Sequence, residues 1–572
     1  MNRDALDKLM LRMDGILDPG GDSVPARALV VHLNTESAET FPIPANWLRS
    51  YVSGPALASR LWAAFAGSDA DNPQAYEADN PVVITASSLS GSDIPFSNSC
   101  TVAFRSPQTN SLFFNVGSHN FGSKLTMFGY RALILCGRLR RTSIVKIDLE
   151  GVTFEVAERL TDMSVSQVGK TAGNSAIITG PAADHRVVYA TAVSDGAPLG
   201  RGGLGYVLGL KNVKILAFGG PETGNSAVKD KENPYLDELR RSGSLMSMKT
   251  AASYGWAPVE NFRKRTDPRL FHLTSDEADR RWGKEPAEKK KHRFMYLRRT
   301  AENKSLPDYA ANVMLGSNVG CFDPVVVMER YNTALEMGLD CVSLGNILGW
   351  ASQVQEEGVH PFGDRVNFTD NEDVIPLIEA IGYGARYTMP DSGDVCSYSI
   401  NGLECGPFDY RGNFPEAVNQ ALGNWFPVYF ALNPKLTVRN TAFWVSLNEE
   451  TVMGLESLGV SPSVLIPLVV SLKGLKLKIL SLFRGSAEKY FCLPDFEKNY
   501  VTDLGKRCRR IVREINSFLG NNAPTIPNHF CVDPDSNCSK EAIVPIRSLL
   551  DSYFTLFNYV SAVQDSGADK GK

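Results

Sequence analysis

The pattern of hydrophobic and polar residues changes once along the chain, near residue 220. From about residue 25 to residue 220, short β-branched or aromatic runs are separated by Gly, Pro, Asn and Ser, which is typical of strands joined by turns. Beyond residue 220, apolar residues mostly recur every three or four positions, the spacing of amphipathic helices. Strands are predicted at 81–88, 101–107, 110–117, 132–139, 143–151, 152–158, 175–181, 186–193 and 213–220, and helices at 324–338, 344–358, 374–387, 414–426, 504–520 and 542–560.

The length of the chain indicates more than one domain. A single hydrophobic core rarely serves 572 residues, so we expect two or three domains. We predict a β-rich domain at 1–220 and two mostly helical domains at 221–425 and 426–572. The predicted fold class is therefore α+β, with the β-rich domain first.

Composition and charge narrow the class of protein. With 43% hydrophobic residues, 21% charged residues and a net charge of −4, the chain resembles a soluble protein and not a general nucleic-acid binder. The N-terminal residues lack the apolar core of a secretory signal. The apolar run 464–483 contains a proline and three lysines, so we interpret it as a buried helix pair or a segment on a membrane surface, not as a membrane span. Ten scattered cysteines indicate a reducing, cytoplasmic location.

Four glycines and an arginine fall within six residues, in the sequence GRGGLG at 200–205. The hexapeptide satisfies G-x-G-x-x-G, but it lacks the preceding strand and the long following helix of a dinucleotide-binding fold. Because glycines let backbone N–H groups approach an anion and arginine offers a fork of donors, the loop predicts a phosphate-binding site. The alternative is a tight turn with an arginine at the surface. The binding residues would be Gly200, Arg201, Gly202, Gly203 and Gly205.

Four blocks of sequence carry a resemblance to a known family. They lie at 105–137, 190–220, 307–351 and 401–412, and include RSPQTNSLFF, GRGGLG, the Gly-Leu-Asp and Trp-Ala motifs, and NGLECGPFDYRG. In order and spacing they resemble the aldehyde:ferredoxin oxidoreductase family, whose members use tungsten or molybdenum held by a bis-pterin. The resemblance implies a β-rich base for the cofactor, covered by two helical domains. It also implies oxidation of an aldehyde to a carboxylate, with electrons leaving through a [4Fe–4S] cluster to ferredoxin.

The cysteines that this family uses for its cluster have no counterparts here. The family pattern places C-x2-C-x3-C in the region that corresponds to about 240–300, and a fourth cysteine at the position of Ser461. The first region contains no cysteine, and none falls between Cys405 and Cys492. Because cluster irons require thiolate ligands, we predict that the [4Fe–4S] cluster is absent.

The other functional positions that the resemblance implies are partly retained. The family's acid/base glutamate and histidine correspond to Ala310 and Ser399, which leaves Asp308 as the nearby carboxylate that we consider for proton transfer. No metal-ligating residue is predicted. Besides the glycine loop, the resemblance implies cofactor contacts from Asp340, from Asn401 in place of the family's lysine, and from Glu456.

Two functions remain open at this point. The chain is either a tungsten or molybdenum bis-pterin oxidoreductase of aldehydes or carboxylates without its own cluster, or a catalytically inactive paralogue that serves as a structural or regulatory subunit. The first would pass electrons to a ferredoxin-like partner or along another route, and the second would pair with an active paralogous subunit. An oligomer is expected in both cases. The basic stretch 284–299 either docks an acidic partner or is a solvated loop.

Overall fold

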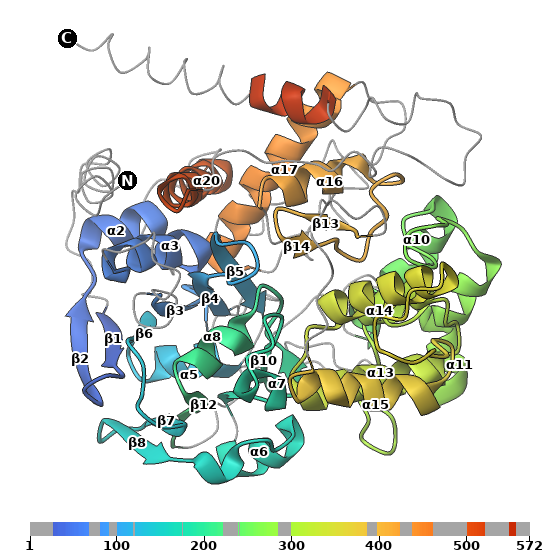
Figure 1. The fold of residues 1–572 in the computed structure, drawn as a ribbon. Coiled ribbons are helices and arrows are strands. Elements are labelled where there is room, and N and C mark those ends of the chain that lie inside the picture. Colours follow the sequence, from blue (N-terminus) through green and yellow to red (C-terminus); the bar gives the residue numbers. More distant parts are fainter. Residues whose placement is uncertain are drawn as a thin grey trace.

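The computed structural model describes twelve parts of the chain (Figure 1). They hold two six-stranded sheets, a two-stranded ribbon and helices that flank the sheets or pack together in a separate helical region. The described residues are 27–67, 80–90, 100–117, 120–173, 175–220, 238, 241–283, 299–385, 397–423, 438–460, 500–520 and 548–555.

The first sheet has the strand order β2-β1-β6-β3-β4-β5 and is antiparallel except for the parallel pair β1 and β6. Residues on both faces of β3 and β4 are buried, which explains their continuous apolar runs. One face packs against α3 and two helices from late in the chain, α17 (Val438–Leu458) and α20 (Tyr500–Phe518). The other face packs against α5 and residues of the second sheet. The elements are β1 (Arg27–His32), β2 (Ser37–Pro42), α2 (Ala45–Tyr51), α3 (Gly54–Phe65), β3 (Val82–Ala86), β4 (Cys100–Arg105), β5 (Leu112–Gly117), α5 (Asn120–Met127) and β6 (Ala132–Cys136).

The second sheet has the order β11-β10-β9-β12-β7-β8, with β12 and β7 parallel and the other neighbouring strands antiparallel. Helices α6 and α8 contact β9 and β12. The loop GRGGLG lies between β11 and α8. The elements are β7 (Ser143–Ile147), β8 (Val152–Val156), α6 (Val165–Ala172), β9 (Ala176–Thr179), α7 (Pro181–Asp184), β10 (Ala192–Ser194), β11 (Ala197–Pro198), α8 (Leu204–Leu210) and β12 (Val213–Phe218).

The helical region has its own hydrophobic core. Aspartates begin its helices: Asp323 accepts a hydrogen bond from the N–H of Val325 at the start of α13, and Asp340 caps α14 in the same way. Gly338, with φ of 72°, ends α13 and allows the chain to turn directly into α14. The elements are α10 (Met248–Tyr254), α11 (Ser275–Trp282), α12 (Tyr309–Met314), α13 (Pro324–Met337), α14 (Cys341–Glu356), α15 (Asn371–Gly382), β13 (Ser399–Ile400), β14 (Leu403–Glu404) and α16 (Phe414–Ala421).

The last described helices return to the N-terminal sheet. Helices α17 (Val438–Leu458) and α20 (Tyr500–Phe518) pack together, and both contact α3, so they share a core with the first sheet (Figure 1). No single helix of the described residues is long and apolar enough to cross a membrane, although the sharply bent pair Tyr309–Val319 and Pro324–Met337 passes on length and composition. The domain boundaries at 220 and 425 remain predictions.

Most predicted elements are present, and the fold is α+β as expected. The strand predicted at 186–193 is wrong over most of its length, because only Ala192–Ser194 pairs in the sheet. The N–H of Thr191 instead donates to the carbonyl of Gly338, and the N–H of Gly205 donates to the carbonyl of Ala190. The run 464–483, Ser461 and almost all of the basic stretch 284–299 lie outside the described residues.

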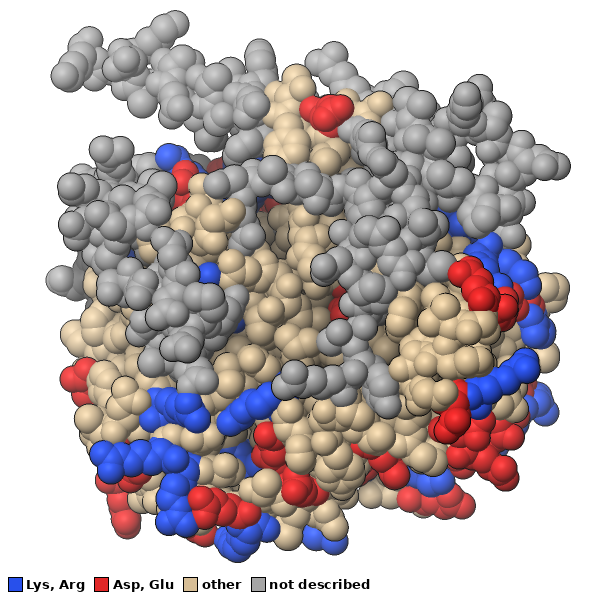
Figure 2. All heavy atoms as spheres, in the orientation of Figure 1, with Lys and Arg blue, Asp and Glu red and all other residues tan. Residues whose placement is uncertain are grey.

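Charged side chains are unevenly spread over the face in Figure 2. Lys, Arg, Asp and Glu gather along its lower edge and lower right, the areas of β7, β8, α6 and α15 in Figure 1, and both signs are mixed there. The centre of this face shows few charges among the described atoms. The charged groups near the glycine loop, Arg201, Asp340 and Glu404, are instead mostly shielded from solvent.

Candidate functional site

The glycine loop is a tight turn packed against the β4–β5 hairpin. Gly200, Gly202 and Gly203 have φ values of 84°, 79° and 82°, a region that favours glycine. A Cβ on Gly202 would lie 2.6 Å from the Phe113 ring, and one on Gly203 would lie 2.5 Å from the carbonyl oxygen of Val188. The glycines are therefore required by close packing within the protein. This agrees with the tight-turn interpretation, but the arginine of the loop is not at the surface.

Arg201 extends from this turn to the start of α14 and to β14. Its Nε donates to Oδ2 of Asp340 at 3.0 Å, and its Nη2 donates to the backbone oxygen of Glu404 at 3.0 Å. Asn115 holds the backbone of Arg201 with two hydrogen bonds, of 3.1 Å and 3.0 Å. The arginine thus joins three elements that are distant in sequence: the glycine loop, helix α14 and the ribbon strand β14.

Ser343 and Gln108 complete this cluster. The Ser343 hydroxyl lies 2.7 Å from Oδ2 of Asp340 and 2.8 Å from Oε2 of Glu404. Gln108, from the β4–β5 loop, donates to the same Glu404 oxygen at 3.0 Å. The name Arg201 cluster is used below for Arg201, Asp340, Ser343, Glu404 and Gln108.

The charges of the cluster are shielded from water. The side chains of Arg201, Asp340 and Glu404 are 19%, 4% and 11% exposed. Burial opposes the charge on Arg201, but Asp340 and Glu404 more than offset this, so the pKa of Arg201 lies above its ordinary value. Burial raises the pKa of Glu404, and Arg201 offsets only part of that rise. The guanidinium of Arg201 therefore contacts two carboxyl groups, so the cluster has no excess positive charge.

Asp308 lies close to this cluster. Its Oδ1 accepts the backbone N–H of Ala311 at 2.9 Å and so caps α12. The side chain is exposed to solvent, yet surrounding protein desolvates it and raises its pKa, and the charge of Asp340 raises the pKa further. Cys341 is partly exposed, and burial, Asp308 and Asp340 hold its thiol pKa well above the usual range. The side chains of Asp308 and Cys341 are thus reached by solvent although protein closely surrounds them.

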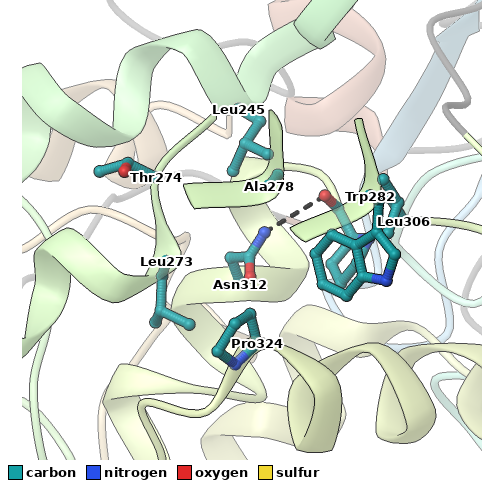
Figure 3. Close-up of a pocket in the computed structure, with 9 residues that line it drawn as sticks. Leu245, Leu273, Thr274, Ala278, Trp282, Leu306, Asn312 and Pro324 are labelled. Atoms are coloured by element: carbon teal, nitrogen blue, oxygen red, sulfur yellow. Dashed lines mark hydrogen bonds between the residues drawn. The ribbon is translucent and has the colours of Figure 1, made fainter. Parts of the chain in front are cut away.

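A separate small cavity is lined in part by Pro307, the residue that precedes Asp308 (Figure 3). Its volume of about 10 Å³ is roughly that of one water molecule. Its lining is mostly apolar, and Asn312 turns its amide to the carbonyl oxygen of Pro307, to which it donates at 3.2 Å. The cavity is too small for an organic substrate. Its lining residues are Leu245, Leu273, Thr274, Ala278, Trp282, Leu306, Pro307, Asn312 and Pro324.

Of the binding residues predicted from sequence, the structure brings together Arg201 and Asp340. Asn401 has φ of 54° and forms the β13–β14 turn, where its amide donates to the carbonyl of Ala421 at 2.8 Å. Glu456 is buried in α17 and affects the pKa of Cys508 in α20. Among the described residues, no group of three or more His, Cys, Asp or Glu side chains is arranged to hold a metal ion.

The prediction from sequence missed Ser343, Glu404 and Gln108. All three lie inside the blocks that carried the family resemblance, and Glu404 directly follows the Gly-Leu pair of the fourth block. An arginine shielded from water needs nearby negative charges, so the carboxylates inside those blocks were candidates for its partners. Ser343 and Gln108 gave no such signal, because nothing in their local sequence distinguishes them from surface residues.

Two models of one protein family match most of the chain. The family model described as "Aldehyde ferredoxin oxidoreductase, N-terminal domain" matches residues 28–220, and that for "domains 2 & 3" of the same protein matches residues 224–388. The tungsten-containing aldehyde ferredoxin oxidoreductase of Pyrococcus furiosus is 26% identical over 389 residues, which cover 60% of this chain and 64% of that protein.

Two further similarities were found. The "Aliphatic sulfonate oxidoreductase, WOR-like subunit" of Pyrococcus furiosus is 22% identical over 62% of this chain and 64% of its own length. Both curated relatives are thus matched over slightly less than two thirds of their length. The fold is also similar to a solved structure, the active site complex BamBC of benzoyl coenzyme A reductase with 1,5-dienoyl-CoA. The match covers 93% of this chain and 94% of the chain in that structure, with a TM-score of 0.64. At 14% identity, this match concerns the fold alone.

Proposed function

The chain belongs to the aldehyde ferredoxin oxidoreductase family, and on that premise we propose that it is an oxidoreductase of the tungsten- or molybdenum-pterin type that works without an iron–sulfur cluster of its own. The observation that carries the proposal is the Arg201 cluster. It places the half-buried Arg201 and two carboxyl groups at the junction of the glycine loop, α14 and β14, beside a hollow that we infer at Asp308 and Cys341. Burial and charged partners shift the pKa values of Arg201 and Glu404, and shifted pKa values are common at functional sites.

The donor set fits the ring end of a pterin. Carboxyl oxygens accept hydrogen bonds from amino and ring N–H groups, and Glu404 and Asp308 supply such oxygens near the hollow. Arg201 supplies donors for oxygen atoms of the cofactor. The phosphate end is less well matched, since Arg201 is paired with Asp340 and the amide of Asn401 is turned to Ala421. We therefore propose that Arg201, Asp308 and Glu404 hold the cofactor.

The residues of the chain would then have separate tasks. When bound, the metal centre supplies the site that takes up the two electrons of aldehyde oxidation. Asp308 has one carboxyl oxygen besides the one that accepts the capping hydrogen bond from Ala311, and its raised pKa makes it a stronger base than an ordinary carboxylate. Electrons would leave to a ferredoxin-like partner, because the sequence has no cysteine between Cys136 and Cys321.

Metal and pterin analysis of protein purified anaerobically from its native host tests this proposal. We expect about one tungsten or molybdenum atom per chain together with released pterin, and no stoichiometric iron, since thiolates for a cluster are missing. Iron and acid-labile sulfide at four atoms each per chain would contradict the cluster-free form. Absence of both metal and pterin would contradict the proposal as a whole.

Replacing Asp308 tests its assigned role. With Asp308→Asn we expect kcat for aldehyde oxidation to fall by about 100-fold or more, because a proton acceptor is lost while the cap of α12 is kept by the asparagine. The matched control is Asp323→Asn, which changes the aspartate that caps α13 in the same way. Equal losses in both variants, or no loss in Asp308→Asn, would remove Asp308 from the mechanism.

A second function, that of an inactive subunit, is favoured by two observations. The guanidinium of Arg201 already has carboxyl partners, and the positions of the family's acid/base residues hold Ala310 and Ser399. In that case the chain would co-purify with an active family member in a fixed ratio. Without this chain, the complex would not assemble, but the active member would keep its metal. Metal and pterin counted on the isolated chain distinguish the two functions.

A further inference from the structure

The hydroxyl of Ser343 lies between two carboxyl groups, and this geometry requires a proton. Its oxygen is 2.7 Å from Oδ2 of Asp340 and 2.8 Å from Oε2 of Glu404. A serine hydroxyl has one hydrogen and can donate it to one oxygen only. If both carboxyl groups were ionised, one of these short contacts would join two oxygens with no hydrogen between them. One carboxyl group must therefore carry a proton and donate it to the serine.

The hydrogen bonds indicate which carboxyl group is protonated. Asp340 accepts the backbone N–H groups of Val342 at 3.0 Å and Ser343 at 3.3 Å, and Arg201 Nε at 3.0 Å. These donors stabilise its ionised form. Glu404 accepts the neutral amide of Gln108 at 3.0 Å, and its contact with Arg201 Nη2 is long, at 3.4 Å. The ionised form is therefore better supported at Asp340 than at Glu404.

We propose that Glu404 holds a proton at neutral pH and that Ser343 connects it to the carboxylate of Asp340, so that the three residues form a proton relay. In one step the O–H of Glu404 passes its proton to the Ser343 oxygen, while the Ser343 O–H passes its proton to Asp340. The serine is unchanged, Glu404 becomes a carboxylate and Asp340 becomes neutral. The reverse step restores the starting state, so charge and atoms balance.

The groups around Glu404 are consistent with this assignment. Arg201 faces it from the glycine loop, Asp340 and Ser343 from α14, and Gln108 from the β4–β5 loop. Burial is the main cause of the raised pKa of Glu404, and the charge of Asp340 contributes in the same direction. Glu404 in turn affects Tyr189 and its neighbour Cys405, whose pKa values are raised chiefly by burial. Arg201 is the cation that opposes these effects.

The role of the relay rests on the proposed function, whereas the protonation of Glu404 does not. Oxidation of an aldehyde to a carboxylate releases protons as well as electrons, and the family's acid/base positions hold Ala310 and Ser399 here. Asp308 is electrostatically coupled to Asp340. Once the relay has moved its proton to Asp340, Glu404 is a carboxylate that accepts one proton released in the site, so the relay adds a second proton acceptor beside Asp308.

Infrared spectroscopy of the full-length protein in H2O and D2O tests the assignment directly. A protonated carboxyl group has a C=O stretch that is separate from the bands of carboxylates and shifts on deuteration. We expect one such band near neutral pH to disappear in Glu404→Gln, and to move in Ser343→Ala because its hydrogen-bond partner is removed. The matched control is Glu449→Gln: Glu449 is also buried, but two arginines and Tyr553 lower its pKa, so its replacement should leave the band intact.

The outcomes separate this inference from the proposed function. An unchanged band in both Glu404→Gln and Ser343→Ala would overturn the assignment to Glu404, and loss of the band only in Asp308→Asn would assign the proton to Asp308. If Glu404→Gln does not fold, the shift in Ser343→Ala decides the question. A band that behaves as expected in protein without metal or pterin would support the inference and contradict the proposed function.

A pH titration gives an independent readout. Because the pKa of folded Glu404 is raised, its contribution to stability is complete below the pKa of an unfolded glutamate and is lost as pH rises through the folded value. The wild type should therefore lose stability relative to Glu404→Gln as the pH is raised above the ordinary pKa of a carboxyl group. The measured quantity is the difference between their unfolding midpoints. A midpoint difference independent of pH between 4 and 8 would contradict a shared proton at Glu404.

Discussion

Replacing Arg201 with methionine is expected to lower the free energy of unfolding by about 3–5 kcal/mol, the range for removing one partner of a buried ion pair. The side chain of Asp340 is 4% exposed, so its charge would lose its counter-ion with little access to water. The junction between the glycine loop, α14 and β14 would loosen at the same time, because Arg201 contacts all three. Chemical denaturation of the purified variant measures the effect.

Two further variants separate charge from shape at this position. Arg201→Lys keeps the charge but not the planar fork, so it should recover only part of the stability. The double variant Arg201→Met with Asp340→Asn removes both charges and should be more stable than Arg201→Met alone. Arg141→Met is the surface control, since Arg141 makes two hydrogen bonds to the exposed Glu158 and should matter little. Equal losses in Arg141→Met and Arg201→Met would show that Arg201 is not a buried connection.

The second large effect is expected for Gly203→Ala, with a loss of about 2–5 kcal/mol in the free energy of unfolding. The left-handed conformation at φ of 82° costs an alanine about 1–2 kcal/mol. The new Cβ would lie 2.5 Å from the carbonyl oxygen of Val188 and 2.6 Å from Cγ of Pro107, which adds overpacking of about 1–3 kcal/mol. Thermal and denaturant unfolding measure the sum.

Gly423→Ala is the matched control for Gly203→Ala. Gly423 has φ of 75°, but a Cβ there meets no atom within 4 Å. Its replacement should therefore cost only the conformational part, about 1–2 kcal/mol. If the two variants lose the same stability, the glycine loop is not packed against the β4–β5 hairpin and is free to move.

The fold was largely predictable from sequence because its signals are local. Runs such as 81–88 and 132–139 are β-branched and bounded by turn residues, and α13 is marked by Asp323-Pro324 at its start and Gly338 at its end. The segment 186–193 has the same strand-like composition. Its backbone bonds instead with Gly338 in the α13–α14 turn, far away in the sequence, and with Gly205 of the glycine loop. Local composition cannot specify them.

The site was predictable only in part, for a similar reason. The six residues at 200–205 stand out by composition, and the resemblance led from them to Asp340. Neither signal indicated that Arg201 would be buried against two carboxyl groups, or that one serine hydroxyl would connect them. Such a cluster arises when elements 61 to 203 residues apart in sequence pack together, so it needs the three-dimensional structure.

The central claim is that the hollow beside Asp308, next to the Arg201 cluster, is a cofactor site. The measurement that tests it most directly is a crystal or cryo-electron microscopy structure of the protein purified anaerobically from its native host. The account predicts density for a metal-bound pterin in that hollow, in contact with Arg201 and Glu404. A hollow that contains only water, with Arg201 still bound to Asp340 and Glu404, would contradict it and favour the inactive subunit.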